Sequence, residues 1–235
     1  RIGVATDKST GQNIQNKILF GARLSGNLNK NYRMGFLNMQ TAEVPESGVP
    51  SYNYTVATGQ RRLGSNSNIR AIFVNRQLFK SDSGNFRVEG YKYNRVAGLD
   101  YNYSFDNNKY TGTLFLHKQF TPENPGNDFA HGYGFVYNTQ KITFNWYHQV
   151  IGKNYTPAVG YVPRNGYKRI SPSGGYKWYP SNSSINRHGP SFDMFYIWDD
   201  VYGLTDYQYA PDYTINFQNQ SSFKMQFRQT YTFLF

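Results

Sequence analysis

A two-residue period runs through most of the 235-residue chain and limits the folds open to it more than any other feature. In RVAGLDYNYSFDNNKYTGTLFLHKQF, residues 95–120, the odd positions 97–105 carry Ala, Leu, Tyr or Phe, and the even positions between them carry Gly, Asp, Asn and Ser. Successive side chains of a β-strand point to opposite faces, so this pattern predicts strands with one apolar and one polar face. A helical period of 3.6 residues is not sustained over several turns anywhere in the chain.

The alternation predicts about twelve strands, joined by turns and loops that alternate in length. Strands are expected at residues 16–25, 31–42, 52–63, 67–79, 95–106, 109–119, 129–139, 141–151, 167–180, 185–199, 212–219 and 222–234. Short polar turns are expected at 64–66, 106–109, 139–140 and 181–184, and longer connections at 43–51, 80–94, 120–128, 152–166 and 200–211. Tight turns at one end and longer loops at the other are typical of outer-membrane barrels.

Composition bears on whether the barrel is membrane-embedded, because a soluble sandwich also alternates. Aromatic residues make up 18% of the chain, and the apolar strand positions favour Tyr, Phe and Trp over Val, Ile and Leu. The opposite positions hold Asn, Gln, Thr, Ser, Arg and Gly, as in a wet barrel interior, so a mean hydropathy of -0.70 is compatible with a membrane protein. We predict an all-β, antiparallel up-and-down transmembrane β-barrel domain over residues 1–235, with a soluble β-sandwich as the alternative.

The chemistry-bearing residues give no recognisable catalytic or metal-binding pattern. Four histidines are isolated in the sequence, no cysteine is present, and the carboxylates form no evident acid–base pair. Nucleotide-binding and nucleophile-elbow motifs are missing as well. We therefore expect no enzymatic activity and no cofactor. The net charge of +11 comes from scattered rather than clustered basic residues, which argues against nucleic acid as a partner.

Several sequence blocks carry a resemblance. They are ILFGARLSGN (18–27), Asn75-Arg76, VGYVPRNGYKR (159–169), SGGYKWYP (173–180) and GPSFDMFYIWD (189–199). In this order they resemble the C-terminal barrel of an uncharacterised Bacteroidota outer-membrane family, whose members often carry an N-terminal carbohydrate-binding module of the family 9 type. The resemblance implies that these residues belong to a longer chain and a larger barrel in the outer membrane. The implied module is not among these residues, so no position here inherits sugar binding.

Two groups of residues are candidates for a functional site. Residues 153–169 break the alternation with prolines and glycines, which predicts an ordered loop, outside the barrel or folded into it. Its basic residues could contact a partner protein or an anionic ligand: Lys153, Arg164, Lys168 and Arg169. The tryptophans Trp146, Trp178 and Trp198 fit either an aromatic belt at the lipid–water boundary or stacking on sugars. Further basic residues fall on the polar strand face, which would make an interior cationic and favour anions: Arg23, Arg33, Arg70, Lys177, Lys224 and Arg228.

The expected function is that of an outer-membrane β-barrel acting as a pore, a receptor or a structural subunit of a cell-envelope complex. The expected partners are outer-membrane lipid and other envelope proteins. The alternative is a barrel that anchors a surface glycan-binding or glycan-processing protein, whose active part lies outside this region.

Overall fold

The chain is all-β and forms a large antiparallel sheet, as the alternation predicts. A computed structural model describes residues 2–7, 10–80, 92–123, 125–181 and 183–234. Within these ranges thirteen strands form the large sheet, and two short strands pair separately. The large sheet contains β3 (Ile18–Asn27), β4 (Tyr32–Thr41), β5 (Ser51–Leu63), β6 (Ser67–Lys80), β7 (Tyr93–Phe105), β8 (Tyr110–Phe120), β9 (Phe129–Asn138), β10 (Ile142–Ile151), β11 (Tyr167–Tyr176), β12 (Ile185–Asp199), β13 (Gly203–Phe217), β14 (Ser222–Gln226) and β15 (Gln229–Thr232). The other described elements are β1 (Val4–Thr6), β2 (Asn13–Gln15) and the 3₁₀ turn η1 (Pro45–Ser47).

Strand neighbours follow chain order from β3 to β14, and β15 also pairs with β13. Short turns make this meander, because they allow consecutive strands to pair directly. The turn between β7 and β8 shows how the sequence does so: Asp106, Asn107 and Asn108 all take left-handed backbone conformations, with φ of 50°, 52° and 68°. Asp and Asn tolerate this region better than other residues with a side chain, so the predicted polar turn is confirmed with a physical reason.

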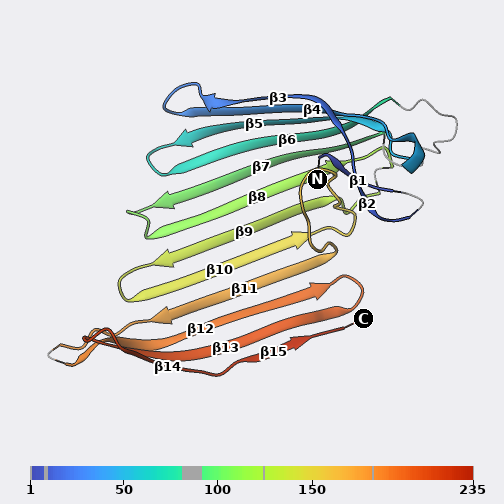
Figure 1. Ribbon diagram of the computed structural model, residues 1–235. Helices are drawn as coiled ribbons and strands as arrows, with labels where there is room; N and C mark the ends of the chain where they lie inside the picture. Colours follow the sequence, from blue (N-terminus) through green and yellow to red (C-terminus); the bar gives the residue numbers. More distant parts are fainter. Residues whose placement is uncertain (1, 8–9, 81–91, 124, 182, 235) are drawn as a thin grey trace. The chain divides into compact units, whose positions relative to one another are not determined.

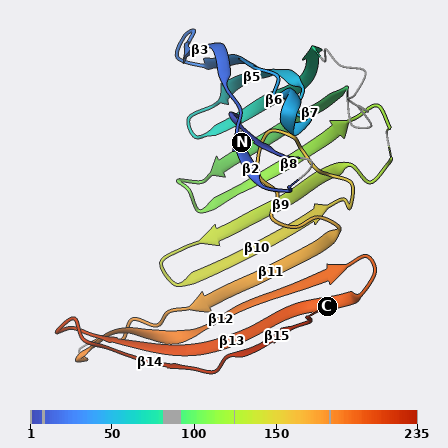
Figure 2. The same ribbon diagram turned by 45° about the vertical axis from the view of Figure 1, so that its right-hand side comes forward.

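The chain divides into two compact units. The first contains residues 1–101, 116–130 and 152–165, and the second contains residues 102–115, 131–151 and 166–235. In the first unit β3, β4, β5 and β6 lie side by side (Figure 1). In the second unit β10, β11, β12 and β13 do the same, as both ribbon views show (Figures 1 and 2).

The sheet of the first unit has two chemically different faces. Its apolar face is defined by four residues that are paired from strand to strand across β3, β4, β5 and β6: Leu24, Phe36, Ala57 and Phe73. Its polar face is defined by Arg33, Gln60 and Arg70, directly paired across β4, β5 and β6, and by Asp100 of β7, which bonds to Arg70. The register places each residue type on one side, since a slip of one residue would reverse every side chain.

The second unit repeats this division. The aromatic face, as we name it, is defined by Phe144 and Trp146 on β10, Tyr196 on β12 and Tyr207 on β13. Trp146 lies opposite Pro172, and Tyr196 lies opposite Tyr207. The opposite face carries polar pairs such as Asn145 and Ser173, whose amide and hydroxyl are 3.0 Å apart.

Large apolar side chains lie mainly on the surface of each unit. Leu24 is 76% exposed and Met225 is 67% exposed, whereas the buried apolar residues among the described ones are few: Val49, Val96, Ala130, Ile151, Tyr155 and Ala210. Apart from β1 and β2, every described strand belongs to one sheet. Within each unit, many large apolar side chains are therefore exposed rather than enclosed as in the core of a β-sandwich.

Two predicted segments near the C-terminus are wrong. Residues 200–211 were expected to form a long connection, but β13 already begins at Gly203 and pairs with β12 from there. The single strand expected at 222–234 is two strands, β14 and β15, both paired with β13. Pro211 explains both errors. A proline predicts the end of a strand, but β13 accommodates Pro211 because this residue lies opposite the gap between β14 and β15, where no strand residue needs its N–H. The Phe227 amide donates to the Pro211 carbonyl at 3.1 Å, and Pro211 has no N–H to return.

Smaller differences concern the ends of elements. The strand expected at 167–180 stops at Tyr176, and β1 and β2 fall in a region for which no strand was predicted. The connection expected at 80–94 lies largely outside the described residues. The described part of the chain contains no helix with the length and hydropathy of a membrane span.

Candidate functional site

Residues 152–165 form an ordered segment that packs on the polar face of the first unit. Two side chains from the strands hold it. The buried Asn94 amide of β7 donates to the Thr156 carbonyl at 3.2 Å and accepts from the Ala158 amide at 3.1 Å. Gln119 of β8 accepts from the Thr156 amide at 2.8 Å and donates to the Asn154 carbonyl at 3.3 Å. Both side chains bond backbone groups, so they fix the path of the segment rather than one of its side chains.

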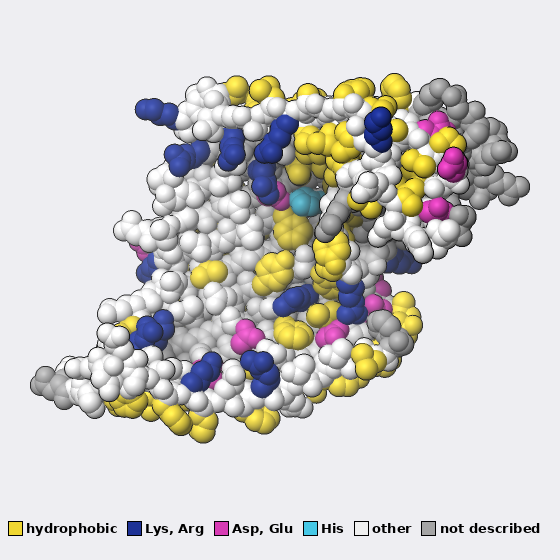
Figure 3. All heavy atoms as spheres, in the orientation of Figure 1, with side chains coloured by type: hydrophobic (Ala, Val, Ile, Leu, Met, Phe, Trp, Pro, Cys, Tyr) yellow, Lys and Arg dark blue, Asp and Glu magenta, His cyan; other side chains and the backbone are white. Residues whose placement is uncertain are grey.

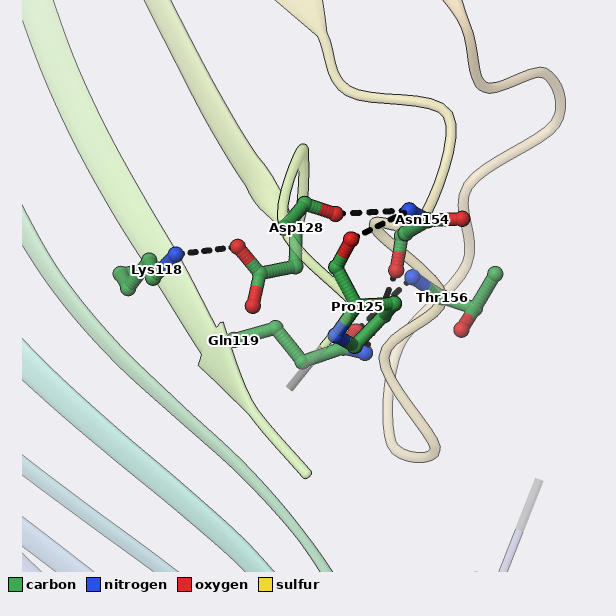
Figure 4. A network of polar contacts seen from close by, with 7 residues as sticks. Lys118, Gln119, Pro125, Asp128, Asn154 and Thr156 are labelled. Carbon is green, nitrogen blue, oxygen red and sulfur yellow. Dashed lines mark hydrogen bonds and ion pairs between the residues drawn. The ribbon is translucent and has the colours of Figure 1, made fainter. Parts of the chain in front are cut away.

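The connection between β8 and β9 also bonds to the segment, through Asn154 (Figure 4). The Asn154 side chain donates to the Gly126 carbonyl at 2.6 Å, and its backbone amide donates to the Asn127 carbonyl at 2.9 Å. Asp128, which is fully buried, forms an ion pair with Lys118 of β8. A buried carboxylate needs such a partner, because an isolated charge is costly away from water. The connections before β9 and after β10 therefore form one bonded structure.

A cluster of polar and titratable groups lies on the same face. Arg70 donates to one oxygen of Asp100 at 2.8 Å and 2.6 Å, and His117 lies 2.9 Å from the other oxygen. Gly98 makes room for the imidazole, since a Cβ at this position would lie 2.3 Å from the His117 ring. Tyr155 is 6% exposed; its burial, and to a smaller degree the charge of Asp100, raises the pKa of its phenol above the ordinary value of 10.0.

Sequence reasoning missed the residues that build this cluster: Asn94, Asp100, His117, Gln119 and Tyr155. For the four strand residues the available signal was their place in the polar half of the alternation, which marks the face but not the long-range partner, and Tyr155 of the loop carried no such signal. Chemically, the cluster offers donors, acceptors and one carboxylate neutralised by an arginine. Such a set can order a segment and bind polar ligands.

The four basic residues predicted as a loop group are separated by the fold. Lys153 and Arg164 lie in the ordered segment of the first unit. Lys168 and Arg169 are residues of β11 in the second unit, so assigning them to the loop was wrong. They point to opposite faces of that strand: Lys168 approaches Asp200 at 3.6 Å, whereas Arg169 bonds to Ser171 at 2.8 Å and lies over the Phe195 ring. Alternation within a regular strand is what divides them.

The tryptophans of the second unit belong to the aromatic face, and two of them sit in ring clusters at opposite ends of β12. Trp178 stacks on His188 with centroids 5.5 Å apart, and His188 bonds to the Tyr213 hydroxyl at 2.6 Å. This group of Trp178, His188 and Tyr213 is called the first aromatic row.

The second aromatic row consists of Trp198, Tyr196, Tyr207 and Tyr231. Their rings stack in sequence across β12, β13 and β15, with neighbouring centroids between 5.3 Å and 6.3 Å apart. Trp146 lies on β10 between the levels of the two rows, opposite Pro172. The three tryptophans therefore do not form one platform, as a single sugar-stacking site would require.

The histidines are less isolated than the sequence suggests. His131 and His148 have ring centroids 5.7 Å apart in the second unit. Across the described ranges, however, no group of three or more His, Cys, Asp or Glu side chains is arranged to hold a metal ion.

Comparisons with protein-family models, with curated proteins and with solved structures find no match to this chain.

Proposed function

We propose that this chain forms the wall of an outer-membrane β-barrel whose polar face lines a hydrophilic interior narrowed by residues 152–165. Such a barrel would bind or transport small hydrophilic ligands. The proposal is supported by the pattern of exposure: one antiparallel sheet whose two units each carry apolar side chains on one face and polar side chains on the other. In water this arrangement exposes costly apolar surface, whereas in lipid it removes that surface from water.

The distance between the two aromatic rows carries most weight. Trp178 bridges to His188 of β12, and Trp198 lies ten residues further along the same strand. At about 3.3 Å per residue this outermost spacing is roughly 33 Å along the strand, and a tilt of about 40° reduces it to about 25 Å along the membrane normal; the eight residues from His188 to Tyr196 correspond to about 20 Å. Aromatic girdles of membrane barrels flank an apolar band of about 25 Å, so the rows match the two lipid–water boundaries.

The residues between the rows fit the same interpretation. On β12 these are Phe192 and Met194, facing Pro211 and Tyr209 of β13. The described residues of this stretch on the aromatic face carry no charged side chain, whereas Asp193 points to the other face and accepts from Gln208 at 2.9 Å. Charge is expensive on a lipid-facing surface near mid-membrane, so its absence here supports a lipid contact.

The narrowed interior follows from the bonds of the ordered segment. Asn94 and Gln119 hold residues 154–158 against strands β7 and β8 on the face that would line the interior. Loops folded inward are a common way to constrict a barrel lumen. This favours a selective or closed barrel over a wide, open pore.

Depth-dependent fluorescence quenching tests the proposal. Three variants of the full chain, each keeping one of the three tryptophans and carrying Phe at the other two, are folded into vesicles whose lipids carry bromine near the headgroups or near the bilayer centre. Trp178 and Trp198 should be quenched more by shallow bromines, and Trp146 more by deep ones. A chain that remains monodisperse in detergent-free buffer, with none of the tryptophans quenched, would refute the proposal.

A further inference from the structure

A hollow of about 430 Å³ lies on the first unit among residues of β3 to β6. Three arginines contribute to its lining, namely Arg23 of β3, Arg33 of β4 and Arg70 of β6. Figure 3 shows several Lys and Arg side chains gathered over these strands. None of the described residues that line the hollow is Asp or Glu. The hollow is therefore strongly cationic.

The arginines differ in whether their charge is already neutralised. Arg70 forms a two-bond ion pair with Asp100, whose second oxygen faces His117. In the described part of the chain, Arg23 and Arg33 form neither an ion pair nor a side-chain hydrogen bond. Two guanidinium groups thus keep their full hydrogen-bonding capacity, and each offers the planar donor fork that matches an oxyanion.

Strand register places neutral donors between the charges. Gln60 lies directly opposite Arg33 on one side and Arg70 on the other. With about 4.8 Å between strands, the backbones of Arg33 and Arg70 are roughly 10 Å apart. Asp100 draws the Arg70 guanidinium toward β7, away from Gln60. The Gln60 amide therefore faces the hollow beside the unpaired Arg33.

A glycine opens the floor of the hollow. Gly35 lies opposite Thr58, and a Cβ on residue 35 would come within 2.8 Å of the Thr58 hydroxyl. Both residues line the hollow, together with Ser25. The absence of a side chain at this position keeps the Thr58 hydroxyl accessible, which suits a ligand that needs both ionic and neutral hydrogen bonds.

We propose that this hollow is a binding site for an oxyanion group, a phosphate, sulfate or carboxylate carried by a small hydrophilic ligand. Arg23 and Arg33 bind the anionic oxygens, and Gln60, Thr58 and Ser25 bind the neutral oxygens beside them. The physiological role rests on the proposed function, because access requires that the polar face line an interior. Binding itself does not depend on it.

Calorimetric titration of the full chain in detergent at low salt tests the site, with inorganic phosphate, sulfate and acetate as separate probes. At least one probe should bind with saturation. Arg23→Gln and Arg33→Gln should each weaken that binding by about tenfold or more, as the loss of a charge-assisted hydrogen bond implies. The matched control is Arg61→Gln, which removes the same charge from β5 on the opposite, apolar face and should change affinity less than twofold.

The outcomes separate this site from the proposed function. No saturable binding of any probe, or an equal loss in Arg61→Gln, overturns the oxyanion site even when the chain inserts into vesicles. Saturable binding that depends on Arg33, by a chain that stays soluble without detergent, keeps the site and overturns the barrel. Two measurements check that each variant is folded: its heat-dependent shift on electrophoresis and its circular dichroism spectrum should both equal those of the unmodified chain.

Discussion

The apolar band between the two aromatic rows can be tested with one substitution. Met194 lies on β12 opposite Tyr209, six residues beyond His188 and four before Trp198. Using about 3.3 Å per residue and a tilt of about 40°, its Cα is roughly 15 Å from the level of His188 and 10 Å from that of Trp198, the outermost members of the two rows. If the rows mark the lipid–water boundaries, Met194 lies deep in hydrocarbon.

Met194→Arg should therefore lower the free energy of unfolding by about 2–4 kcal/mol, the cost of an arginine near the midplane of a membrane barrel. On a surface in contact with water, the same change would cost no more than about 0.5 kcal/mol. Equilibrium unfolding by guanidinium in lipid vesicles, followed by tryptophan fluorescence, measures the difference. The two environments thus predict effects that differ severalfold.

Asp193→Arg is the matched control, because the neighbouring residue of the same strand points to the opposite face. It removes the hydrogen bond from Gln208 and should cost only about 0.5–1.5 kcal/mol. A Met194→Arg variant as stable as the unmodified chain in vesicles would refute the assignment of this face to lipid. A large loss in both variants would instead indicate a general intolerance of arginine on this strand.

Three further changes address the ordered segment and the C-terminal strands. Asn94→Ala should destabilise the segment by about 1–3 kcal/mol, because two backbone groups lose their partner, and hydrogen exchange at the Ala158 amide reports it. The pKa of Tyr155 is raised in the folded state, so folding favours the neutral phenol. Its contribution to the stability of the fold is complete below pH 10.0 and falls as the pH rises above this value. Tyr155→Phe should remove this alkaline loss of stability, which hydrogen exchange across alkaline pH measures. Pro211→Ala supplies an N–H opposite Phe227, and the new amide at position 211 should exchange roughly tenfold more slowly than a free amide.

Controls for these changes come from the other unit and from neutral replacements. Asn145→Ala also removes a cross-strand amide bond, but it should leave exchange at residue 158 unchanged. Equal exchange at this amide with and without Asn94 would show that other contacts hold the segment. An unprotected amide at position 211 would mean that the break between β14 and β15 has another cause than the missing donor.

The strands and their faces could be predicted because side-chain alternation is a local property. Arg33, Gln60 and Arg70 all occupy polar positions, and each does lie on the polar face once the register is known. The same reasoning failed at Pro211, because a proline signals a break in sequence and only its neighbours reveal whether the missing N–H matters. The strand predicted at 167–180 is confirmed at its first residue, whereas the loop interpretation of residues 153–169 ran three residues into it and so wrongly included Lys168 and Arg169.

The sequence by itself therefore determined an all-β chain of two-faced strands linked in order, because a two-residue period leaves few other ways to separate apolar from polar side chains. The tertiary structure decided where residues 152–165 lie and which polar groups meet. Asn94 and Ala158 are 64 positions apart in the chain, and Arg70 and Asp100 are 30 apart. Contacts over such separations depend on strand register and loop path, and neither is encoded in the local alternation of side chains.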